Sequence, residues 1–157
     1  MRFAFLCGLL LDVGTPLLLQ VASDRLPNAH ARREEVLDVV NERHAAAGAE
    51  LCRRWRLSER IATALEHHHH DAFGIAIDSA THDAVGSLID IVVLADALAD
   101  LSVSDIDDDG IVARVGEHPA SMRLNLYGDD ILSIVERKAT LLATSSAVGA
   151  MPDRRTS

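Results

Sequence analysis

Aromatic residues are scarce in this sequence of 157 residues. Phe, Tyr and Trp together make up 3% of the chain, whereas hydrophobic residues as a whole make up 48%. The apolar content is therefore mostly Leu, Ala, Val and Ile, a balance that favours packed helices over a sheet. A chain of this length suits one domain and can bury a substantial core. We expect an all-α fold.

Positive charge is also scarce. The net charge is −9, and Lys138 is the single lysine. No basic patch with interleaved aromatic residues is present, so nucleic acid is not an expected partner. The two cysteines, Cys7 and Cys52, fall inside apolar helical patterns and lack the spacing of metal ligands. They are typical of reduced core residues in a cytoplasmic protein.

Long uninterrupted hydrophobic runs are missing. The segment Met1–Leu19 is strongly apolar, but Asp12 interrupts it before it reaches the roughly 18 residues that a membrane span needs. A single Arg2 is a weak match to the charged start of a signal peptide. We expect no membrane association here, and a pair of core helices of which Phe3–Asp12 is buried on nearly all sides. Core-like sequence begins at residue 3, which indicates a fragment or a domain whose earlier helices are missing.

Helical periodicity predicts a compact bundle of about six or seven helices. A single domain is expected over residues 1–143, with a flexible tail over residues 144–157. A loop is expected at Asp71–Asp83 and short helical or turn pieces at Leu101–Leu126. The predicted helices cover Phe3–Asp12, Leu17–Ser23, Arg32–Arg43, His44–Arg56, Ser58 to the histidine run, Ala84–Asp100 and a last helix capped by Asp129 that runs to Leu142.

Four consecutive histidines, His67–His70, follow the helix that Ser58 is expected to cap. Its apolar stripe of Ile61 and Leu65 continues to His68 or His69, so imidazoles of this run should point into the core. A shift of one residue turns a side chain by 100° around the helix, so spacing alone leaves open which histidines face inward.

Four polar residues fall on apolar faces, one on each of four helices: Asp12, His44, His68 and Asp96. Metal sites in helical bundles are built in this way, from inward side chains of facing helices. Imidazole and carboxylate ligands without thiolate suit one Fe, Mn or Zn ion. The alternative is a core without metal, in which carboxylates and imidazoles hydrogen-bond to one another.

Four segments of the chain resemble the HDOD family of the HD superfamily, in the right order and with the right spacing from residue 3 to about residue 100. FLCGLLLDVG is similar to the family's AGLLHDIG segment. RHAAAGAEL with the following RWRL is similar to HAEVGALLLERWGLP. The last two segments, IATALEHHH and IVVLAD, resemble IVEAIRHHH and IVHLAD.

The resemblance implies two different functions. HD-superfamily proteins are metal-dependent phosphohydrolases and phosphodiesterases. HDOD proteins are mostly bacterial regulatory or signalling modules, often with an eroded metal site. Here the doublet that names the superfamily is Leu11-Asp12, Thr15-Pro16 replaces an expected lysine, and no Gly-Tyr-Pro motif follows the histidines.

We therefore expect a non-catalytic regulatory module that acts through protein partners or as a homodimer. The alternative is a phosphohydrolase or phosphodiesterase in which Asp12, His44, His68 and Asp96 bind the metal. In that case His67 or His69 would orient the substrate or donate a proton.

Overall fold

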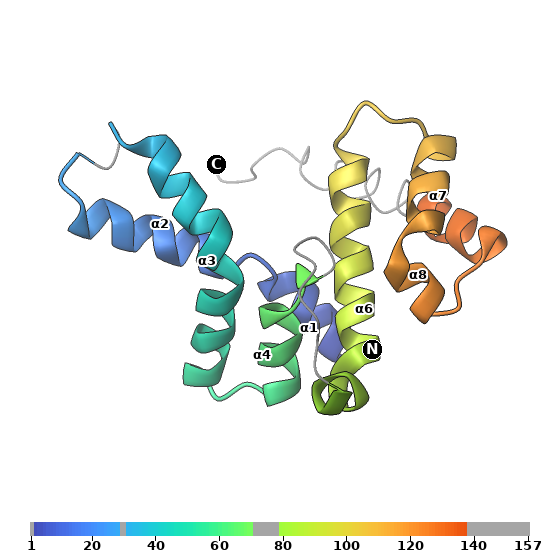
Figure 1. Cartoon of the computed structure of the whole chain (residues 1–157), viewed down its shortest axis with the longest axis horizontal. Coiled ribbons are helices and arrows are strands. Elements are labelled where there is room, and N and C mark those ends of the chain that lie inside the picture. Colours follow the sequence, from blue (N-terminus) through green and yellow to red (C-terminus); the bar gives the residue numbers. More distant parts are fainter. Residues whose placement is uncertain (1, 29–30, 71–78, 138–157) are drawn as a thin grey trace, which may run out of the picture.

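A computed structural model describes residues 2–28, 31–70 and 79–137, and every regular element in them is a helix (Figure 1). This confirms the all-α prediction. Residues 128–137 are also helical. The named helices are α1 (Arg2–Leu10), α2 (Gly14–Arg25), α3 (Arg33–Arg54), α4 (Glu59–Glu66), α6 (Ser79–Ser102), α7 (Asp108–Glu117) and α8 (Pro119–Arg123).

The long helix α6 stands at the centre of the molecule, with α1 and α4 on one side and α7 and α8 on the other (Figure 1). Helix α3 packs against α4, and α2 packs against α3. Helix α2 and the first half of α3 project away from the body (Figure 1). Residues 14–43 are called the α2–α3 arm below.

The core lies where α4 and α6 meet. The inner face of α4 is fully buried, with Ile61 2% exposed and Leu65 0% exposed. The stripe predicted on α6 is also buried, as its spacing of three and four residues requires. It consists of Val85, Leu88, Ile89, Val92 and Val93.

Helix α3 is continuous, so the prediction of separate helices at Arg32–Arg43 and His44–Arg56 is wrong. No proline interrupts this stretch, and Ala45–Ala47 are strong helix formers. Gly48 lies inside the helix, where it is packed against Gly14 at the start of α2. The glycine therefore serves a close contact between helices and does not end one.

The prediction that Phe3–Asp12 is buried on nearly all sides is also wrong. Cys7 is the one buried residue of α1, while Phe5 is 73% exposed and Leu9 70% exposed. The helix contacts α4 and α6 along one side, and none of the described residues covers the other. By length and composition alone, Arg2–Arg25 could cross a membrane, a criterion that core helices and signal sequences also meet.

Two helices end in a way that the sequence did not indicate. Arg56 and Asn125 have φ values of 58° and 53°, the left-handed conformation that usually selects glycine. The N–H of Leu57 donates to the carbonyl of Cys52, and that of Leu126 donates to Ser121. These bonds close the ends of α3 and α8.

Three boundary predictions are corrected. Ser58 occupies the N-cap position of α4, but its side chain makes no capping bond. Of the loop predicted at Asp71–Asp83, residues 79–83 belong to α6 and the rest lies outside the described residues, as does the predicted tail at 144–157. The last helical run begins at residue 128, so Asp129 does not precede it; instead the Asp130 carboxylate accepts the N–H of Tyr127.

A buried ion pair that sequence reasoning missed holds α8 against α6. The guanidinium Nε of Arg123 donates to Asp90 Oδ1 at 2.7 Å, and Asp90 is 4% exposed. A buried carboxylate without such a partner would be costly, so this pair fixes the position of the C-terminal helices relative to α6.

Gly14 is the glycine whose substitution should cost most. A Cβ at this position would lie 2.0 Å from the carbonyl oxygen of His44 and 2.8 Å from the nitrogen of Gly48. Both neighbours are backbone atoms of a continuous helix and cannot move aside. We expect Gly14→Ala to lower the free energy of unfolding by about 1–3 kcal/mol in urea titration.

Gly8→Ala is the matched control, because a Cβ there meets nothing within 4 Å and lies within α1. Alanine should raise the free energy of unfolding by roughly 0.5–1 kcal/mol at this helical position. Equal stability of the two variants would contradict the close approach of α2 to α3.

Candidate metal centre

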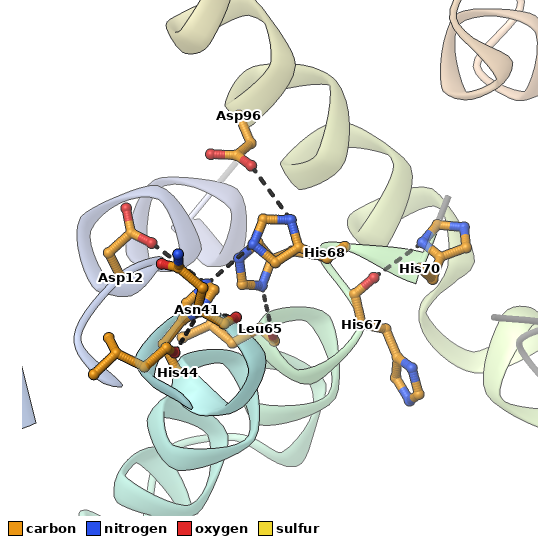
Figure 2. Close-up of polar contacts among 10 residues, drawn as sticks. Asp12, Asn41, His44, Leu65, His67, His68, His70 and Asp96 are labelled. Carbon is orange, nitrogen blue, oxygen red and sulfur yellow. Dashed lines mark hydrogen bonds and ion pairs between the residues drawn. The ribbon is translucent and has the colours of Figure 1, made fainter. Parts of the chain in front are cut away.

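The histidine run forms a turn that closes α4. The helix ends at Glu66, and residues 67–69 turn before the chain continues at His70. The carbonyl of His67 accepts the N–H of His70 at 3.0 Å. Because the chain leaves helical geometry here, neighbouring imidazoles point in different directions: His68 is 1% exposed, whereas His67 is directed away from the other imidazoles (Figure 2).

His44 lies in the middle of α3 and is 7% exposed. Its Nδ1 lies 3.2 Å from the carbonyl oxygen of Val40 and 2.9 Å from that of Asn41. Carbonyl oxygens only accept, so Nδ1 carries the proton. In the neutral imidazole Nε2 then presents a lone pair.

His68 has the same arrangement on a different element. Its Nδ1 donates to the carbonyl of Leu65, which leaves Nε2 as the lone-pair nitrogen. That Nε2 is buried and has no hydrogen-bond partner. Burial lowers the pKa of His68 to about 4, with smaller effects from His69 and His44, so the ring is neutral near pH 7.

The rings of His44, His68 and His69 lie in mutual contact. Figure 2 shows those of His44 and His68 side by side. The ring centroids of His68 and His69 lie 3.9 Å apart, and those of His44 and His69 lie 5.0 Å apart. The Nε2 atoms of His44 and His69 are separated by 3.0 Å. One ring nitrogen from each of the three lies within 4.8 Å of the others, a spacing that could hold a metal ion. We call these three residues the histidine cluster.

Two carboxylates, Asp12 and Asp96, lie beside the histidine cluster (Figure 2). Asp12 Oδ1 lies 3.8 Å from His44 Nε2, and Asp96 Oδ2 lies 3.9 Å from His69 Nδ1. Asp12 is exposed, whereas Asp96 is half-buried on α6. Burial, together with the negative charges of Asp100 and Asp12, raises the pKa of Asp96 to about 6.

The donor set fits one divalent ion. Neutral imidazoles are metal ligands, and three of them with one oxygen ligand make a common four-coordinate site for zinc. A core held by hydrogen bonds alone would account for the contacts of His44, His69 and Asp96. It would leave His68 Nε2 to an ordered water or a cation, because no group of the described residues bonds to this buried nitrogen. This nitrogen is the observation in favour of a metal.

The structure thus brings together Asp12, His44, His68 and Asp96, and adds His69 as a third imidazole. His67 lies outside this group of residues. Leu11 is partly buried and packs against the core at the doublet position, where the family's pattern has histidine.

A hollow of about 270 Å³ opens beside the histidine cluster, and His118 and Asp100 contribute to it. Sequence reasoning did not single out either residue. His118 comes from the junction of α7 and α8, where its Nδ1 accepts the N–H of Ala120 at the start of a helix. Because Pro119 follows it, His118 could have been predicted to cap a helix. Nothing in the sequence indicated that His118 would line the hollow. The lining residues are His68, His69, Val93, Asp96, Ala97, Asp100, His118 and Pro119.

Comparison with known proteins gives one result. The model of the HDOD domain family matches residues 2–71, which contain α1 to α4 and all three histidines of the cluster. No curated protein and no solved structure matches the chain. Asp96 lies beyond the matched residues, so its place in the site depends on the geometry alone.

In the presence of a chelator, the shifted pKa of His68 and the shifted pKa of Asp96 change the stability of the fold with pH in opposite directions. The pKa of His68 is about 4 in the folded chain against an ordinary value of 6.5, so the unfolded chain binds more protons between these values and acidification destabilises the fold. The pKa of Asp96 is about 6 against 3.8, so acidification stabilises the fold over that range. We expect Asp96→Asn to be more stable than wild type at pH 7, on the order of 2 kcal/mol, and to lose stability more steeply toward pH 4.

Urea titrations at several pH values measure this difference. Asp83→Asn, which removes an exposed carboxylate from the same helix, is the matched control and should follow the wild-type curve. A parallel shift of Asp96→Asn and wild type at every pH would show that Asp96 ionises normally.

Proposed function

We propose that this chain is a regulatory module that acts through protein contacts and not through catalysis. The premise of this proposal is the match of residues 2–71 to the HDOD domain family, which belongs to the HD superfamily. The observation that supports this proposal most is the charge of the hollow beside the histidine cluster.

A phosphate substrate would meet the wrong charge in this hollow. Asp96 and Asp100 line it, and no arginine or lysine is among its lining residues in the described part of the chain. Enzymes that transfer phosphoryl groups place cationic side chains or metal ions against the phosphate oxygens. One divalent ion would do no more than neutralise the two carboxylates, which leaves no net positive charge for a dianionic group.

The ligand set is also too small for two ions. Three imidazoles and either of the two flanking carboxylates fill the four positions of a single ion, which leaves one carboxylate for a second ion. Leu11 supplies no ligand at the doublet, and Asp12 lies on the exposed side of His44. The described residues therefore do not supply enough ligands for a pair of ions that activates water and clamps the leaving group.

The second candidate is a metal-dependent phosphohydrolase, and the buried lone pair of His68 Nε2 favours it. When bound, a divalent ion would supply a Lewis acid and lower the pKa of a water molecule. His44, His68 and His69 would hold the ion, with Asp12 or Asp96 beside them. His118 would face a substrate in the hollow and could donate a hydrogen bond through Nε2, because its Nδ1 already accepts one.

Metal loading and ester hydrolysis separate the two candidates. Untagged protein is loaded with Fe²⁺, Mn²⁺ or Zn²⁺, its metal content is measured by elemental mass spectrometry, and it is assayed with p-nitrophenyl phosphate and bis(p-nitrophenyl) phosphate. We expect no more than one ion per chain and no hydrolysis above that of the His44→Ala variant. The reason is the acidic hollow, which is the same in every loaded form.

His82→Ala is the matched control, because His82 is exposed on α6 and lies outside the histidine cluster. It should bind metal as the wild type does. The phosphohydrolase would be established, and our proposal overturned, by turnover that His44→Ala abolishes and His82→Ala keeps, provided that circular dichroism shows both variants folded at the assay temperature.

A further inference from the structure

The α2–α3 arm leaves an apolar groove uncovered. In the described part of the chain, α3 is the one helix with which α2 makes extended contact. A groove of about 350 Å³ runs between the two helices, and its apolar lining includes Leu18, Val21, Ala22, Leu26, Val36 and Val39. Val21 is 48% exposed and Val39 is 56% exposed. Apolar side chains at such exposure along a groove are typical of a binding surface.

The charge of the arm differs from that of the rest of the chain. Residues 14–43 contain four arginines and five acidic residues, so they carry −1 of the total charge of −9. The groove lining contains both signs of charge, Arg25, Arg32 and Glu35, and Arg32 forms an ion pair with Glu35. Another copy of the arm can therefore approach with little repulsion, whereas the remaining surface, which carries −8, repels a second copy.

The arm is a pair of helices packed against each other, the unit from which a four-helix bundle can be assembled. Helix α2 has 12 residues, a length of about 18 Å, and the first half of α3 runs beside it over a similar distance. Two such helix pairs related by a two-fold axis bury their grooves against each other, as in bundles assembled from two hairpins.

We propose that this chain forms a homodimer in which the α2–α3 arms of two copies pack groove to groove as a four-helix bundle. The inference rests on the proposed function in one respect: protein contacts, and not the hollow, carry the activity of the chain. A lipid surface is a poorer occupant, because anionic headgroups would repel a chain of charge −9 whose arm itself contains five acidic residues.

The size of the groove face of the arm determines the protein concentrations at which a dimer should be detectable. A face about 18 Å long and two helices wide is smaller than the roughly 800 Å² per partner of a standard stable interface. We therefore expect a dimer that dissociates in the micromolar range, visible by sedimentation velocity of the whole chain between about 1 and about 200 µM.

Two substitutions place a charge in the groove from different helices: Val21→Glu on α2 and Val39→Glu on α3. Both side chains are already exposed, so the fold should tolerate them, and we expect each to weaken dimerisation at least about tenfold. Val103→Glu is the matched control: Val103 is 88% exposed outside the arm, and the variant should dimerise as the wild type does. A single cysteine introduced at Val21 should form a disulfide between copies on mild oxidation.

Three outcomes would overturn the inference. They are a monomer at every concentration, a dimer that both glutamate variants keep, and a monomer that binds vesicles of neutral lipid through the arm. The first of these, with no ester hydrolysis, would leave the regulatory function standing. Hydrolysis by a protein whose dimer behaves as expected would overturn the regulatory function alone.

Discussion

The rest of the site depends on how two buried imidazoles are held by their own backbone. His44 and His68 each donate the Nδ1 proton to a carbonyl three or four residues earlier in the chain. Such a bond fixes both the tautomer and the direction of the ring, so the lone pair on each Nε2 points away from the parent element. His69 supplies the third ring, and its contacts with His44 and Asp96 join α3, the turn after α4 and α6 at a single place.

The close approach of α2 to α3 sets the other side of the site. Gly14 lies directly against the carbonyl of His44, a contact that a side chain would prevent. The corner between α1 and α2 is thereby held over His44, with Asp12 beside the imidazole and Leu11 turned toward the core. A histidine at position 11 would need a polar partner among the apolar core residues, so the leucine stabilises the corner while it removes a ligand.

Hydrophobic periodicity predicted the features that a single helix determines, such as which of its faces is buried. The buried stripes of α4 and α6 follow from spacing alone, which also predicted inward imidazoles in the histidine run without deciding which ones. The failures come from contacts between elements: α1 has too few neighbours to bury its apolar face, and Gly48 inside α3 marks a crossing and not an end. Arg56 closes a helix in a conformation that glycine usually adopts, so no residue type there predicted the end of α3, whereas Asn125 is a residue that adopts this conformation more readily. The sequence left His67 and His69 as alternatives. His69 joins the cluster because of a turn after α4, which helical spacing does not describe.

The histidine cluster and the α2–α3 arm therefore favour different functions. Around the histidine cluster, neutral imidazoles and a carboxylate whose pKa is raised can bind a cation or hydrogen-bond to one another, but Asp96 and Asp100 oppose a phosphate. On the arm, opposite charges nearly cancel and the groove is apolar, which suits another polypeptide. Gly14 begins the arm and also contacts His44, so the packing of α2 on α3 couples the groove to the cluster. A change in the cluster that moves α3 would then change the groove, which gives a regulatory module a physical path from one to the other.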